Sequence, residues 1–146
     1  MKNSYEEEIT NTKKFLRRYK NNMSCVDRLE LKLQTLDERI KSIKSPNYSG
    51  MPRGSTPVTI EELISDKMEL EKRIVKLKLK GKQLRSDILD RIDLLDDSRY
   101  CEVLEAYFID NKSITEIADE MQYTERHVYS LYKKGIEKLM KINVSD

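Results

Sequence analysis

Four polar side chains between residues 126 and 133 have types and spacing suited to contacting a nucleic acid. Arg126, Tyr129, Ser130 and Lys133 are spaced i, i+3, i+4 and i+7, so on a helix they share one face. Arginine can bond a guanine edge twice, tyrosine and serine can reach bases or phosphate, and lysine adds charge near the backbone. We expect Arg126, Tyr129 and Ser130 to contact bases, and Lys133 with Lys134 to contact phosphate. The plainer interpretation is a solvated helix face.

Boundary signals indicate how this face is positioned. Ser113 and Glu116 have the spacing of a capping box, which predicts a helix over about 114–121. Gln122 and Tyr123 then form a turn, and Thr124 is an N-cap candidate for the helix that carries the basic face. Two capped helices with so short a turn favour a helix-turn-helix over a merely solvated face, because the second helix would present its N-terminal turns to bases.

The apolar residues complete a three-helix unit. The last helix is expected to bury a stripe at helical spacing, formed by Val128, Leu131, Gly135 and Leu139. A preceding helix is expected to bury Val103, Leu104, Tyr107 and Phe108, and to end at Asp110–Lys112.

The stretch SITEIADEMQYTERHVYSLYKKGIEKL resembles region 4 of sigma-70-type factors. The T-E-R-H-V-Y string and the Y-S-G-M-P-R-G loop at Tyr48–Gly54 are similar to small phage and prophage proteins of Gram-positive bacteria, of the RinA and ArpU type of late transcription regulators. The resemblance implies double-stranded DNA and host RNA polymerase as partners. It also implies a DNA-binding set of Thr124, Glu125, Arg126, His127, Tyr129, Ser130, Lys133 and Lys134.

Two departures from the sigma pattern matter. Glu125-Arg126-His127 stands where sigma region 4 commonly has Arg-Glu-Arg, so a promoter −35 element is not carried over as the target. Gly135 stands where the family usually has alanine, which costs a helix about 1 kcal/mol. The first half of the chain has no segment like sigma region 2, so the chain does not resemble a complete sigma factor.

Composition and breakers predict an all-α fold in two parts. The chain is 37% charged and has no Trp, which suits long solvated helices. All three prolines lie between Pro46 and Pro57, so a Pro/Gly-rich loop at 45–58 should join two amphipathic helices. We expect a coiled-coil-like helical hairpin over 1–95, with an interruption of its first helix near Asn21-Asn22, and the helix-turn-helix domain over 96–146.

Charge is distributed unevenly between these parts. Residues 1–94 carry 21 Lys and Arg against 15 Asp and Glu, whereas residues 95–146 carry 7 against 11. Phosphate contacts dominate DNA affinity, so we expect weak binding by a single copy and a need for a second copy or for polymerase. Apolar surface left over on the N-terminal helices can form a homodimer.

The residue types do not favour an enzyme. Asp87, Asp90 and Asp93 are spaced as on the solvent-exposed face of a helix. His127 has no nucleophile or orienting acid beside it in the sequence. Cys25 and Cys101 lack metal-binding spacing, so we expect no metal and no cofactor. The N-terminus has no apolar secretion segment and no run is long enough for a membrane span, which predicts a cytoplasmic protein with no membrane partner.

Three functions are compatible with these observations. The first is a DNA-binding transcription regulator that works with host RNA polymerase. The second is a DNA-packaging component of the small-terminase type, which also combines a helix-turn-helix with helical oligomerisation segments. The third is an interaction module that binds polymerase without reading DNA.

Overall fold

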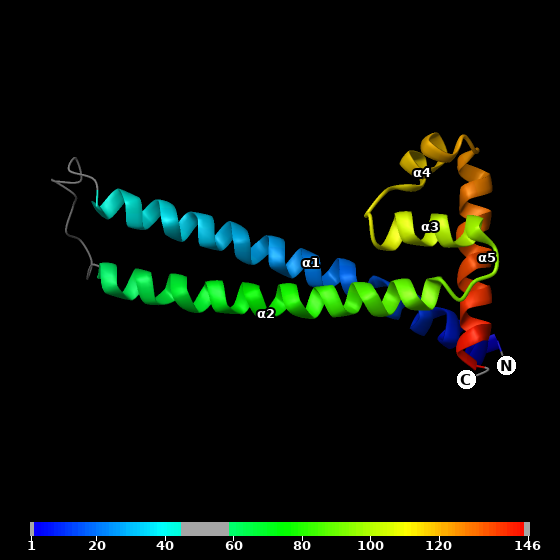
Figure 1. Ribbon diagram of the computed structural model, residues 1–146, viewed down its shortest axis with the longest axis horizontal. Coiled ribbons are helices and arrows are strands. Elements are labelled where there is room, and N and C mark those ends of the chain that lie inside the picture. The colour runs from blue at the N-terminus through cyan, green and yellow to red at the C-terminus, as the bar shows by residue number, and fades with distance from the viewer. Residues whose placement is uncertain (1, 45–58, 145–146) are drawn as a thin grey trace. The chain divides into compact units, whose positions relative to one another are not determined.

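The described residues of the computed structural model, 2–44 and 59–144, form five helices and no strand, which confirms the all-α prediction (Figure 1). The helices are α1 (Lys2–Lys44), α2 (Ile60–Ile92), α3 (Ser98–Phe108), α4 (Ile114–Met121) and α5 (Glu125–Val144). The Tyr48–Gly54 loop lies outside the described residues. Within those residues, no helix combines the length and apolar composition that crossing a bilayer requires.

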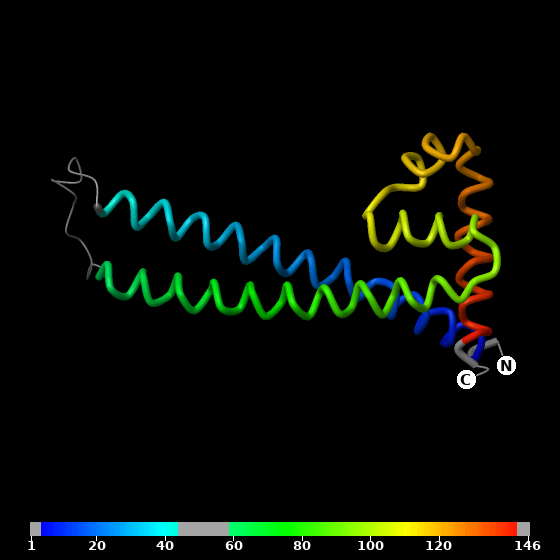
Figure 2. The backbone as a smooth tube through the Cα atoms, viewed as in Figure 1, coloured from blue at the N-terminus to red at the C-terminus, as the bar shows by residue number. Residues whose placement is uncertain are grey.

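Both long helices run without a break (Figure 2). The interruption expected near Asn21-Asn22 is wrong: α1 continues through both residues, since the segment contains neither proline nor glycine and Asn22 is buried. Thr59 caps α2, because its Oγ1 accepts a hydrogen bond from the Glu62 backbone N–H at 3.1 Å. Glu61 and Glu62 lie in the first turn, where the helix dipole favours negative charge.

Contacts between residues group the chain into two compact units. The first comprises residues 1–21 and 81–146, and the second comprises residues 22–80. Each long helix therefore contributes to both units. This grouping differs from the division after residue 95 suggested by the sequence, and that domain division stays a prediction.

In the first unit, a hydrophobic core joins the three short helices to one end of each long helix. Leu16 of α1 and Ile88 and Ile92 of α2 share this core with α3, α4 and α5. The core residues from the short helices and their connections are Val103, Leu104, Phe108, Ile109, Ile117, Ala118, Val128, Leu131, Tyr132, Ile136 and Leu139. The N-terminal end of α1 is thus part of the support on which α5 is built.

In the second unit, α1 and α2 pack against each other with opposite directions. Val26 and Leu29 of α1 are buried with Ile74 of α2. Two ion pairs fix the register, and they join Asp37 to Lys67 at 2.8 Å and Glu30 to Lys78 at 3.0 Å. This core is thin, because only a few side chains of each helix are fully withdrawn from solvent.

Candidate nucleic-acid interface

Helix α4 is fixed by a cap made from its own sequence. Ser113 Oγ accepts from the Glu116 backbone N–H at 3.1 Å, and Glu116 Oε1 accepts from the Ser113 N–H at 3.1 Å. This is the capping box that the sequence predicted. Lys112 Nζ also lies 2.7 Å from Glu120 Oε2 and ties the preceding loop to the helix. The start of α4 is therefore set by local hydrogen bonds.

The chain reverses between α4 and α5 within three residues. Gln122 adopts the left-handed conformation with φ 59°, and its N–H donates to the Ala118 carbonyl. The Tyr123 N–H donates to the same carbonyl at 3.0 Å. Thr124 Oγ1 accepts from the His127 N–H at 3.1 Å and caps α5, as predicted. These bonds fix the angle at which α5 leaves the turn.

The inner face of α5 is the stripe predicted from the sequence. Val128, Leu131, Gly135 and Leu139 are all buried. A Cβ added at Gly135 would lie 3.2 Å from Leu104 Cδ1, so glycine allows α5 to approach α3 closely. With this stripe turned inward, the opposite side of α5 must face solvent.

The eight candidate residues lie at the start of α5 or on its solvent side. Ser130 is half-buried, and the other seven are exposed, namely Thr124, Glu125, Arg126, His127, Tyr129, Lys133 and Lys134. No described residue forms an ion pair or hydrogen bond with the Arg126 guanidinium. The Tyr129 ring is 52% exposed, with Lys133 Nζ 5.9 Å from its centroid. The start of α5 therefore presents an unpaired cation next to an exposed aromatic ring.

Three of the eight residues make contacts that hold the first turn of α5. Thr124 caps α5, and the Glu125 carboxylate accepts a short hydrogen bond from the Thr115 hydroxyl of α4. The His127 ring meets the Tyr123 ring edge-on, with centroids 4.6 Å apart. These three contacts hold the first turn of α5 in place. The remaining five candidates have side chains better placed for an external ligand.

The N-terminal end of α1 supports α5 through aromatic rings, an arrangement that the sequence reasoning missed. Tyr132 of α5 stacks on Tyr129 with centroids 6.1 Å apart, and it meets Tyr107 of α3 edge-on at 5.0 Å. Lys20 of α1 places its Nζ 4.0 Å from the Tyr107 centroid. The positive charge of Arg17 on α1 acts on the Tyr132 phenol. The basic residues Arg17, Arg18 and Lys20 of α1 were the available signal in the sequence.

Tyr132 lies at the centre of this aromatic group, and burial is the largest cause of the shift in its pKa. Burial raises the pKa of Tyr132 above its ordinary value, and the charge of Tyr107 acts in the same direction. The Arg17 guanidinium opposes the shift. Tyr132 is therefore neutral at ordinary pH, and its hydroxyl remains available to Arg17.

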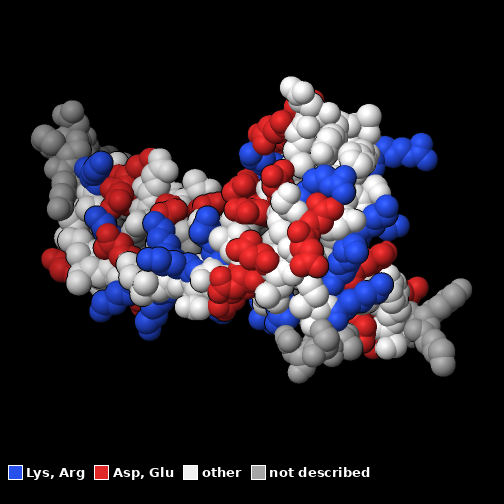
Figure 3. Space-filling model, turned by 45° about the vertical axis from the view of Figure 1, so that its right-hand side comes forward, with Lys and Arg blue, Asp and Glu red and all other residues white. Residues whose placement is uncertain are grey.

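The surface of the first unit separates its charges. Figure 3 shows Asp and Glu side chains gathered in one area of the body formed by α3, α4 and α5, with Lys and Arg side chains beside them. Five acidic residues of α3, α4 and their connection are exposed, namely Glu102, Asp110, Glu116, Asp119 and Glu120. From Arg126 to Lys141, by contrast, five basic residues accompany the single acid Glu137. The acidic excess thus belongs mainly to the supporting helices.

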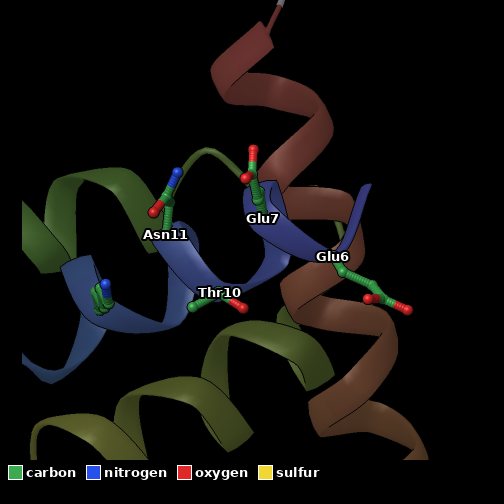
Figure 4. A pocket seen from close by; sticks show the side chains of 5 residues that line it. Glu6, Glu7, Thr10 and Asn11 are labelled. Atoms are coloured by element: carbon green, nitrogen blue, oxygen red, sulfur yellow. The ribbon is translucent and has the colours of Figure 1, made fainter. Parts of the chain in front are cut away.

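Other hollows and reactive groups lie elsewhere on the described residues. A hollow near the start of α1 is lined by one helix only, and Glu6 points away from Glu7 and Asn11 there (Figure 4). The Cys101 thiol lies 3.4 Å from the Ile92 carbonyl oxygen, and burial followed by the charge of Asp93 raises its pKa. A thiol so placed stays protonated and is a poor nucleophile. Within 2–44 and 59–144, no three candidate metal ligands cluster.

No protein-family model, no curated protein and no solved structure matches this chain.

Proposed function

We propose that this chain is a DNA-binding transcription regulator of the phage and prophage type. In this proposal, α4, the turn at Gln122–Thr124 and α5 act as a helix-turn-helix similar to sigma region 4, with α5 as the recognition helix. The observation that carries the proposal is the start of α5, where the cap at Thr124 fixes the helix and the exposed Arg126 guanidinium has no partner among residues 2–44 and 59–144. Such a helix can enter a major groove with its N-terminal turns toward the bases.

The roles within α5 follow from exposure and side-chain chemistry. Arg126 and Tyr129 are the base-contacting residues, and the half-buried Ser130 lies within the same face. Lys133 and Lys134 are exposed further along the helix and neutralise phosphate. Thr124, Glu125 and His127 position the first turn through their contacts with α4, the turn and the backbone of α5. Host RNA polymerase is the partner that compensates for the weak binding expected of one copy.

A second candidate rests on the acidic surface of α3 and α4. Exposed carboxylates such as Glu102, Asp119 and Glu120 repel DNA and attract a basic protein surface. In this alternative, the unit binds RNA polymerase without reading DNA. The two proposals differ in what Arg126 does, because only the first makes DNA binding depend on that guanidinium.

The test is recovery of DNA fragments from the genome that encodes the chain. The purified protein is incubated with these fragments and competitor DNA at about 0.15 M salt, where non-specific binding is weak. Our proposal predicts enrichment of a discrete site, lost in Arg126→Ala and retained in Arg39→Ala. The second variant makes the same charge change on an exposed residue of the second unit. No enrichment, together with polymerase binding that survives Arg126→Ala, would favour the second candidate.

A further inference from the structure

The part of α2 that belongs to the second unit has two apolar stripes, and the fold uses only one of them. Leu70, Ile74 and Leu77 pack with Val26 and Leu29 of α1. The unused stripe consists of Ile64, Met68, Val75 and Leu79, which are exposed by 37%, 54%, 57% and 64%. At about 100° per residue, these four side chains lie within an arc of about 60°. The four side chains form two pairs on one face of α2, with Glu71 and Lys72 between the pairs, and this is more than scattered surface hydrophobicity.

We propose that this stripe binds the same stripe of a second copy of the chain, with the two α2 helices antiparallel about a twofold axis. The spacing of the stripe carries the first part of the argument. Ile64 and Leu79 are equally distant in sequence from the point midway between residues 71 and 72, and so are Met68 and Val75. An antiparallel pair centred there sets Ile64 opposite Leu79 of the second copy and Met68 opposite its Val75. The stripe is therefore complementary to itself, as a twofold interface requires.

The charge along α2 provides the second part of the argument. Residues 60–71 carry five acidic side chains and one basic one, whereas residues 72–80 carry five basic side chains and no acidic one. An antiparallel pair places the acidic half of each helix against the basic half of the other. A parallel pair would place like charges together, which opposes association. An antiparallel pair centred between residues 71 and 72 therefore aligns both the apolar side chains and the opposite charges of the two helices.

The flank of the stripe identifies the charged groups that would meet. Lys67 and Lys78 already pair with Asp37 and Glu30 of α1. On the other flank, a hollow beside Met68 is lined by Ser65, Glu69, Lys72, Arg73 and Lys76. A twofold axis brings this flank against its own copy, and Glu69 then lies level with the stretch between Lys72 and Lys76 of the second copy. The hollow gives space for side chains of the second copy beside Met68.

The contact adds a second apolar seam to α2. At about 100° per residue, this seam lies on the side of α2 away from Leu70, Ile74 and Leu77, which pack on α1. This inference stands apart from DNA binding, since it uses only residues of the second unit. Joined to the proposed function, a twofold pair would favour a DNA site with two inverted half-sites.

Sedimentation equilibrium of the full chain without DNA tests the contact. We expect a reversible dimer for the wild type and a monomer for Met68→Lys/Val75→Lys, with helix content unchanged by circular dichroism because both side chains are exposed. Leu31→Lys is the matched control, since Leu31 is 66% exposed but lies on α1 outside the stripe. This variant should dimerise like the wild type. A wild-type monomer, a larger ring, or a dimer unaffected by the double variant would overturn the proposal.

A charge exchange tests the antiparallel geometry separately. Glu69→Lys alone, and Lys72→Glu/Lys76→Glu alone, each place like charges across the twofold axis and should weaken self-association at least tenfold. Mixed together, these two variants restore opposite charges at both ends and should form a mixed dimer. Failure of the mixture to associate more strongly than either variant alone would contradict the antiparallel arrangement.

Discussion

The Lys20 ammonium of α1 lies 4.0 Å from the centroid of the Tyr107 ring of α3, so a residue near the chain's N-terminus contacts the helix on which α5 packs. Burial and then the charge of Arg17 lower the pKa of Lys20, and the electron-rich ring face opposes this by favouring the ammonium. The relationship makes the start of α1 a structural part of the candidate DNA-binding unit.

Replacing this lysine should therefore destabilise the first unit. We expect Lys20→Gln to lower the free energy of unfolding by about 0.5–2 kcal/mol, the range for a cation held over an aromatic ring. Lys14→Gln, an exposed change on the same helix, should alter it by less than about 0.5 kcal/mol. Urea unfolding followed by circular dichroism measures both. Equal effects from the two variants would show that the ring contact contributes nothing.

Alkaline pH should destabilise the protein through Tyr132. Burial raises the pKa of this phenol in the folded state, so above about pH 10 the unfolded chain releases the proton more readily than the folded chain does. The stabilising contribution is complete below that pH and is lost as pH rises through the folded-state pKa. Tyr132→Phe should flatten the decline in unfolding free energy between about pH 9.5 and 11. An unchanged slope in the variant would rule out Tyr132 as its source.

The buried Asn22 side chain should make the second unit less stable than an apolar side chain at the same position would. The Asn22 side chain is buried and its Oδ1 has no hydrogen-bond partner among the described residues. A buried acceptor without a partner costs about 1–3 kcal/mol, so Asn22→Leu should raise the free energy of unfolding by about 1–2 kcal/mol. Asn21→Leu, one residue away and exposed, is the control. A loss of stability in Asn22→Leu would mean that the amide forms a bond through water or a second copy.

Features set by neighbouring residues could be predicted from the sequence. The capping box of Ser113 and Glu116 and the cap at Thr124 need only side chains three residues from the groups that they bond. The buried stripe through Val128 and Leu131 follows from helical periodicity alone. These local signals located α4 and the start of α5.

Contacts between distant segments could not be predicted in the same way. Leu16 packs in the core of α3, α4 and α5. The apolar periodicity of α1 shows that Leu16 faces a neighbouring helix, but it does not show which helix that is. The hydrogen bond between Thr115 and Glu125 likewise depends on the angle between two helices. It gives Glu125 a structural contact, whereas the sequence placed this residue only among those that bind DNA. Asn22 suggested an interruption, yet packing keeps it within a continuous helix.

The most direct test of DNA reading by α5 compares Arg126→Ala with Lys133→Ala on a recovered site and its single-base variants. Arg126→Ala should cost about 1–3 kcal/mol on the intact site and lose discrimination at one base pair. Lys133→Ala should weaken binding to all sequences alike and lower the slope of log K against log salt by about 1. Equal, sequence-independent losses from the two variants would contradict base reading by Arg126 and with it the proposed role of α5.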